Sequence, residues 1–267
     1  MKERLFYSFC VNVGAWFLGL ITSTLNLFSI MMRTFKGVFH FKGREKGEVV
    51  KQMYFIGNKS LLFITITLGS LGMVLVFQVC LQINKITGDQ SQVGPEFIKG
   101  MVHAFAPILT AMMLATRVGA GIAAEIGSMV VTEQVDALRM NGVDPVDYIL
   151  VPRFIASVVM TFVLGIFAMV VVIFAGAWMA HHAFNVNYNV FFVFDKVTWG
   201  DLLIGSVKLI VHGGAIPIVS GYCGFTATRG SEGVGNATTR AVINSSLTVI
   251  ILDFLISSVG LLTVQKV

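Results

Sequence analysis

The stretch LLFITITLGSLGMVLVFQVCLQI, residues 61–83, holds 23 consecutive residues without a charged side chain. A helix needs about 20 apolar residues to cross the hydrocarbon of a bilayer, so this segment is long enough to span a membrane. It is too long for a strand of a membrane barrel, in which lipid-facing and lumen-facing residues alternate over about 10 residues. The stretch therefore predicts a transmembrane helix in an all-α protein.

Four further segments are long and apolar enough to span, at residues 101–126, 154–180, 202–224 and 242–264, and of these only 154–180 is free of charged side chains. Composition agrees, because apolar residues make up 55% of the 267 residues and charged residues only 12%, whereas soluble domains carry about 25% charged residues. Three scattered cysteines also exclude a secreted disulfide scaffold. We expect an all-α integral membrane protein with five spans in residues 61–267.

Residues 6–32 are also free of charged side chains, and Arg4 and Arg33 bracket them. Length alone predicts a sixth span. The segment is nevertheless dotted with serine, threonine and asparagine, as in a helix that lies in the plane of the membrane interface. The residues themselves leave both interpretations open.

Basic residues predict the orientation of the spans. Nine of the 19 Lys and Arg precede residue 60, and cytoplasmic loops are enriched in these residues. With residues 1–60 cytoplasmic, the inner loops hold Arg139, Arg153, Arg229 and Arg240, and the outer side holds only Lys85, Lys99, Lys196 and Lys266. We therefore expect a cytoplasmic N-terminus and an outer C-terminus. The net charge of +5 then suits attraction to anionic lipid headgroups at the membrane surface and does not indicate binding to nucleic acid.

Two motifs resemble sites but favour structural roles. Residues 119–124 spell G-x-G-x-x-A inside an apolar helix, where small residues allow another helix to approach closely. His181 and His182 are neighbours that point about 100° apart, which suits a polar cap of the third span rather than a metal site. The sequence has no Gly-x-x-x-x-Gly-Lys motif. We expect no catalytic residue, metal or cofactor.

The loop between the second and third spans contains a short amphipathic helix at residues 132–140. Thr132 is expected to cap its start, and Asn141-Gly142 to end it in a left-handed turn. One face is apolar and the others are polar; the apolar residues are Val131, Val135 and Leu138, and the polar ones Glu133, Gln134, Asp136 and Arg139. Such a helix can dock into a groove on a cytoplasmic partner.

Four charged residues lie inside the spans, where charge is costly and usually faces a partner or a watery cavity. Arg117 and Glu125 are about 80° apart around the second span and can share a broad face without contact. Lys208 and Asp253 lie in different spans and can pair across the bundle. Structural ion pairs and a polar cavity both remain open.

Several motifs in this order resemble the MlaE/YrbE permease family. They are RVGAGIAAEIGSM at 117–129, TEQVDAL at 132–138, Asp144-Pro145, Pro152-Arg153, and GVGNATTRAV at 233–242 followed by Asp253-Phe254. The resemblance covers roughly residues 33–262. It implies the inner-membrane permease subunit of an ABC transporter for phospholipid or a related lipid.

The resemblance also implies a homodimer with an interfacial N-terminal helix in each copy, within residues 1–60, ahead of a basic cytoplasmic linker. Two cytoplasmic ABC ATPase subunits would dock on Thr132, Glu133, Gln134, Asp136, Leu138 and Arg139. A ring of periplasmic MCE-domain proteins would cover the outer face, and the lipid cavity would lie at the dimer interface.

One departure from the family concerns the start of the second span. Where the family often has Arg-Glu-x-Gly-Pro, this chain reads His-Ala-Phe-Ala-Pro at 103–107. We hypothesise an apolar cavity entrance lined by Val76, Phe77, Cys80, His103 and Phe105. Two other classes remain as alternatives: a passive membrane scaffold, and an intramembrane enzyme built around His103, Glu125 and His212. Polar groups inside the spans favour the transporter over the scaffold.

Overall fold

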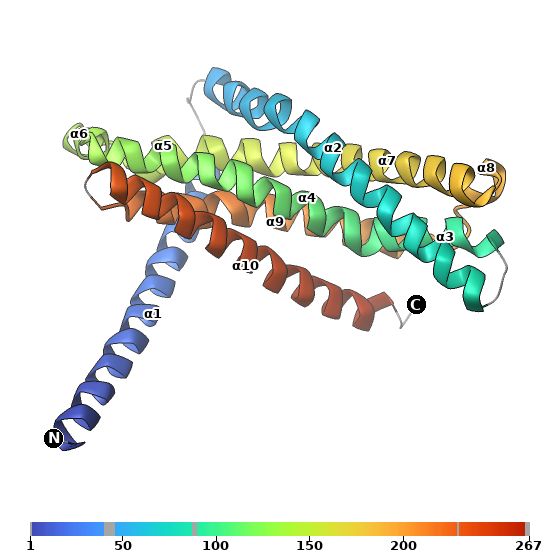
Figure 1. Cartoon of the computed structure of the whole chain (residues 1–267). Helices are drawn as coiled ribbons and strands as arrows, with labels where there is room; N and C mark the ends of the chain where they lie inside the picture. Colours follow the sequence, from blue (N-terminus) through green and yellow to red (C-terminus); the bar gives the residue numbers. More distant parts are fainter. Residues whose placement is uncertain (1, 40–45, 87–89, 229, 265–267) are drawn as a thin grey trace.

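The computed structural model describes residues 2–39, 46–86, 90–228 and 230–264, and the regular elements in these ranges are all helices. Four long helices, α2 (Lys46–Ile86), α7 (Val151–Phe184), α9 (Trp199–Phe225) and α10 (Ser231–Val264), lie along one elongated bundle (Figure 1). A fifth line of helix runs from α3 (Val93–Gly100) through α4 (Ala106–Leu114) to α5 (Ala120–Val131).

Five helical stretches in the described part of the chain are long and apolar enough to cross a membrane. They are Gly47–Lys85, Val93–Val131, Val146–Phe184, Trp199–Phe225 and Ser231–Leu262. The first four contain the segments expected from sequence, and the fifth ends two residues before its expected end at residue 264. All five begin before the expected apolar core. Residues 46–60, expected to belong to a basic linker, continue the helix of the first span.

The second span is not uniformly α-helical. Two π-helical turns interrupt it, η2 (Met101–Phe105) and η3 (Ala115–Gly119), and a third, η4 (Val146–Leu150), precedes α7. Pro107 lies in the first turn of α4, directly after η2. Because proline has no amide hydrogen, a change of helical register just before it costs few hydrogen bonds.

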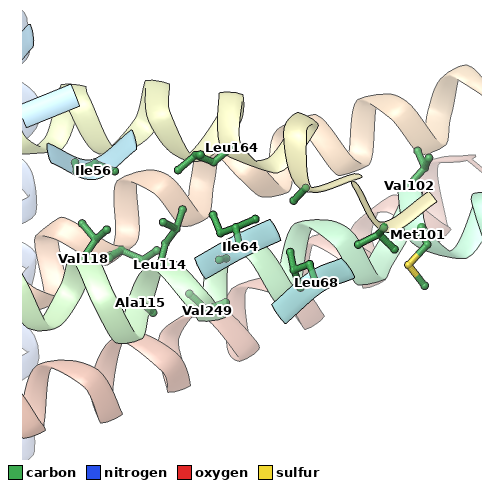
Figure 2. Packing of buried hydrophobic residues seen from close by; sticks show 14 of the residues in the cluster. Ile56, Ile64, Leu68, Met101, Val102, Leu114, Ala115, Val118, Leu164 and Val249 are labelled. Carbon is green, nitrogen blue, oxygen red and sulfur yellow. The ribbon is translucent and has the colours of Figure 1, made fainter. Parts of the chain in front are cut away.

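Small residues bring the helices close together. A β-carbon added at Gly119 would lie 2.8 Å from the Ser220 hydroxyl, and one added at Gly224 would lie 3.1 Å from the Ala123 carbonyl oxygen. The expected role of the 119–124 stretch in close packing is therefore confirmed. Helix α2 packs along α7, and α9 packs along α10. Buried apolar side chains such as Ile64, Leu114 and Leu164 fill the space between the helices (Figure 2).

The N-terminal helix α1 (Lys2–Phe39) stands away from the bundle (Figure 1). Its C-terminal part makes the contacts: the Phe35 and Phe154 rings pack edge to face with centroids 5.5 Å apart, and Thr34 is fully buried. Farther toward the N-terminus, Leu25 and Phe28 are more than half exposed. The helix thus joins the body near the end that carries α6.

Helix α6 (Gln134–Met140) is the short helix expected between the second and third spans. Its start differs from the prediction. The Thr132 hydroxyl donates to the Ser128 carbonyl 2.9 Å away, so Thr132 ends α5 instead of capping α6. Glu133 occupies the capping position with a left-handed φ of 59° and no side-chain cap. Gly142, with φ of 75°, makes the expected left-handed stop.

Candidate functional site

Helix α6 lies at one end of the bundle (Figure 1). Val135 is buried and Leu138 half-buried against the core, so the apolar face points inward as expected. The remaining side chains expected to bind a partner are exposed: Thr132, Glu133, Gln134, Asp136 and Arg139. The Arg139 guanidinium lies 3.0 Å from the Asp136 carboxylate, an exposed ion pair within the helix.

Met140 is part of the same surface and was not predicted. Its side chain is 89% exposed at the C-terminal end of α6. A large exposed apolar side chain is informative when it lies within a polar surface, since such residues are enriched in interface cores. The sequence could have indicated this exposure, because Met140 lies outside the helix face formed by Val135 and Leu138.

An ion pair joins the two helices that flank the segment containing α6. Nη2 of Arg153, in the first turn of α7, lies 2.8 Å from Oε2 of Glu125 in α5. Arg153 is buried, and its other terminal nitrogen donates to the Ile149 carbonyl at 2.9 Å. The pair therefore ties the second span to the third on the two sides of α6.

Arg117 and Glu125 are in the same span but bind different partners. The Arg117 guanidinium donates to the hydroxyl of Ser60, a buried residue of α2. Glu125 binds Arg153 of α7. The two charges therefore connect the second span to two different helices.

Lys208 of α9 and Asp253 of α10 form the pair expected across the bundle. Their charged atoms lie 3.0 Å apart, although their angles are not those of a hydrogen bond. Lys208 is fully buried and the Asp253 side chain is 14% exposed. His212, one turn along α9, is also fully buried. A charge this far inside the bundle is stabilised by its partner, since water cannot reach it.

The residues of the hypothetical intramembrane enzyme lie far apart. His103 binds the carboxylate of Asp201 at 2.8 Å, near the end of the bundle that carries α8 (Tyr188–Phe191). Glu125 lies 22 residues farther along the same span, which corresponds to about 33 Å of helix. This separation does not assemble an acid–base site from His103, Glu125 and His212.

The five residues expected to line the lipid cavity differ in burial. Val76 and Cys80 are buried, with Val76 packed against Gly176 of α7. Phe77 and Phe105 are 39% and 47% exposed. His103, the fifth, is held by Asp201. Phe77 and Phe105 are thus the two that a second molecule can contact.

Two apolar grooves lie elsewhere on the spans. One, of about 580 Å³, is formed mainly by α7, α9 and the segment between them. The other, of about 360 Å³, lies between α9 and α10 and is lined by residues such as Leu203, Val207, Leu255 and Val259. Sequence periodicity could not reveal either groove, because each depends on how two helices meet.

A family model and several known proteins are similar to this chain over most of its length. The family model described as permease MlaE matches residues 49–259. A probable ABC transporter permease protein of Rickettsia typhi is 34% identical over 211 residues, covering 78% of this chain and 81% of that protein. The intermembrane phospholipid transport system permease protein MlaE of Haemophilus influenzae is 32% identical over 79% of this chain and 82% of its own. The chloroplastic protein TRIGALACTOSYLDIACYLGLYCEROL 1 of Arabidopsis thaliana is 30% identical over 86% and 64%.

Proposed function

Because the chain belongs to the MlaE permease family, which consists of ABC transporter permeases, we propose that it moves phospholipid or a related hydrophobic lipid. The lipid would pass between the inner membrane and a periplasmic MCE-domain partner. The name of the Haemophilus influenzae relative, an intermembrane phospholipid transport permease, supports this substrate class. The permease itself would make no covalent bond, and a separate ATPase would supply the energy.

The observation that carries the mechanism is that the exposed helix α6 lies in the segment between Glu125 and Arg153, which pair with each other. We propose that a cytoplasmic ATPase subunit binds the exposed face formed by Glu133, Gln134, Asp136, Arg139 and Met140. Closure of the ATPase dimer would push on α6, and the ion pair at its base would pass the displacement to α5 and α7. The spans would then change the shape of the lipid cavity.

The α6 end would face the cytoplasm. Lys51, Lys59 and Arg240 lie in the N-terminal parts of α2 and α10, and both helices start at this end of the bundle (Figure 1). Positive charge on this side agrees with the positive-inside rule. Helix α1 would lie in the cytoplasmic interface of the inner membrane, since it leaves the bundle near α6 and carries exposed apolar side chains such as Phe28.

A second copy of the chain would complete the lipid cavity. Helix α10 is the least buried of the five candidate spans, and its exposed apolar residues include Ile251, Phe254 and Leu262. Two copies meeting near α10 would enclose apolar surface between them, and Phe77 and Phe105 remain candidates for its entrance. Each buried CH₂ of a lipid contributes about 0.8 kcal/mol relative to water, so release needs a large change in the cavity.

The test is a double substitution on α6, Arg139→Glu with Met140→Asp. Both side chains are exposed, and an exposed ion pair contributes at most about 1 kcal/mol to stability, so the spans should stay folded. We expect the ATPase to be lost from the purified complex and phospholipid transfer between vesicles to stop. Lys51→Glu, an exposed charge reversal on α2, is the matched control and should keep both.

An ATPase that still co-purifies in the same ratio, with unchanged transfer, would exclude docking on α6. If the wild-type complex assembles with its ATPase but transfers no phospholipid under any condition, the result supports a passive membrane scaffold instead of a transporter.

A further inference from the structure

The larger apolar groove lies between the third and fourth spans, at the α8 end of the bundle. Its volume is about 580 Å³. Its walls are almost entirely apolar and come from η2, α7, the 192–197 segment and the start of α9; among its residues are Val102, Ile166, Val170, Phe174, Phe194 and Leu202. None of its lining residues belongs to α6, to α10 or to the five residues discussed for the lipid cavity above.

The groove has the length of a lipid chain within one leaflet. Its wall on α7 runs from Ile166 to Phe174, a stretch of nine residues whose ends lie about 12 Å apart along the helix. One leaflet supplies about half of the 30 Å of hydrocarbon in a bilayer. An acyl chain that lies along α7 can therefore fill the groove over most of the depth of its leaflet.

The end of the groove nearest α8 carries groups that suit a lipid headgroup. Trp199 lines the groove and is 83% exposed, as expected for an indole at the membrane interface. Lys196, next to the lining residue Val197, pairs with Glu96 at 2.7 Å and keeps 40% of its side chain exposed. An ammonium beside a carboxylate complements the phosphate and amine of a zwitterionic headgroup.

A single unbranched acyl chain is thin and flexible, and it can follow the apolar walls of a groove of about 580 Å³. Inside a bilayer, preference for such a site comes from close packing rather than from the hydrophobic effect, since the surrounding lipid is equally apolar.

We propose that this groove binds one acyl chain of a membrane phospholipid from the leaflet at the α8 end, with the headgroup beside Trp199 and Lys196. The site goes beyond the proposed transport function and does not depend on it, because the groove is formed by the spans and the segment between two of them. Lipid held there would fill the gap between α7 and α9 during any movement of the two helices.

The test uses the full chain, purified with whatever subunits accompany it and reconstituted in vesicles of phosphatidylethanolamine and phosphatidylglycerol. A phosphatidylethanolamine with a photoreactive diazirine in its acyl chain is added and illuminated. The labelled fraction of the 192–202 segment is then measured by mass spectrometry. This segment forms the wall opposite α7, so substitutions on α7 do not alter its own reactivity.

Val170→Phe fills the groove, and Val163→Phe is its matched control. Both valines lie on α7, two turns apart on nearly the same face, and they are 48% and 49% exposed, but only Val170 lines the groove. We expect labelling of residues 192–202 to fall several-fold in Val170→Phe and to stay at the wild-type level in Val163→Phe. Phe194→Trp, a second substitution that fills the groove from the opposite wall, should lower the labelling of residues 166–174.

Equal labelling in Val170→Phe and Val163→Phe would overturn the proposal, because the groove would then be ordinary lipid-facing surface. Disulfide-linked dimers of Val170→Cys in the same vesicles would also overturn it, since a second copy would occupy the position. Melting midpoints near that of the wild type confirm that the variants remain folded.

Discussion

Nη2 of Arg153 in α7 lies 2.8 Å from Oε2 of Glu125 in α5, and the two residues enclose the segment that contains α6. The pair is asymmetric, because the Arg153 side chain is 9% exposed and that of Glu125 is 42% exposed. Loss of the carboxylate leaves a buried guanidinium with fewer partners, whereas loss of the guanidinium leaves a carboxylate that water can reach. Burial therefore makes the two single substitutions unequal.

We predict that Glu125→Ala destabilises the protein more than Arg153→Met. Glu125→Ala should cost about 2–3 kcal/mol, in line with loss of a hydrogen bond to a buried charged group. Arg153→Met should cost about 1 kcal/mol less, since methionine fills much of the same apolar volume. Denaturant titration of the purified protein measures both, with Glu48→Ala on the exposed part of α2 as the control. Equal costs would show that the burial of Arg153 does not govern the pair.

The Lys208–Asp253 pair gives a second prediction. Lys208→Met or Asp253→Leu alone should cost about 3–5 kcal/mol, because each leaves an uncompensated charge in the bundle. The double substitution removes both charges and should recover most of this loss. The interaction energy from the double-mutant cycle is the measurement. A double variant as unstable as the sum of the singles would mean that the two charges do not stabilise one another.

Close approach between α5 and α9 gives a third prediction. A β-carbon at Gly224 would lie 2.8 Å from the Ile126 β-carbon, so Gly224→Ala should destabilise by about 1–3 kcal/mol through overpacking. Gly235 in α10 has no atom within 4 Å of the same position, and there alanine should stabilise by about 0.5–1 kcal/mol. Thermal unfolding of the two variants should therefore shift in opposite directions. A Gly224→Ala variant that unfolds no earlier than the wild type would show that α5 and α9 can separate without cost.

The first turn of α9 gives a fourth prediction. Thr198 and Asp201 form a reciprocal capping box, and the second oxygen of Asp201 binds His103 at 2.8 Å. Thr198→Ala removes only part of the cap and should cost about 1 kcal/mol. Asp201→Ala also releases His103 and should cost about 2–3 kcal/mol. Fluorescence of the adjacent Trp199 measures unfolding of this end of the bundle. Equal destabilisation by Thr198→Ala and Asp201→Ala would indicate that the contact of Asp201 with His103 contributes nothing to stability.

The sequence by itself determined which segments of residues 61–264 form helices long and apolar enough to cross a membrane, but it left residues 6–32 open between a span and an interfacial helix. Those properties depend on length, apolarity and the backbone hydrogen bonds that each helix makes within itself. The amphipathic pattern of residues 132–140 likewise placed Val135 inward and Arg139 outward. The pairing of Lys208 with Asp253 also followed, because a charge inside a bundle needs a counter-charge and these two lie in adjoining spans.

Only the tertiary structure decided how each helix is rotated and which residues meet across it. Val76 and Phe77 are neighbours of similar character, yet Val76 is buried against α7 and Phe77 is exposed. Glu125 binds Arg153, and Thr132 closes α5 instead of opening α6. The groove between α7 and α9 arises in the same way. Rotation and register result from the packing of many side chains at once, so no local pattern along the chain encodes them.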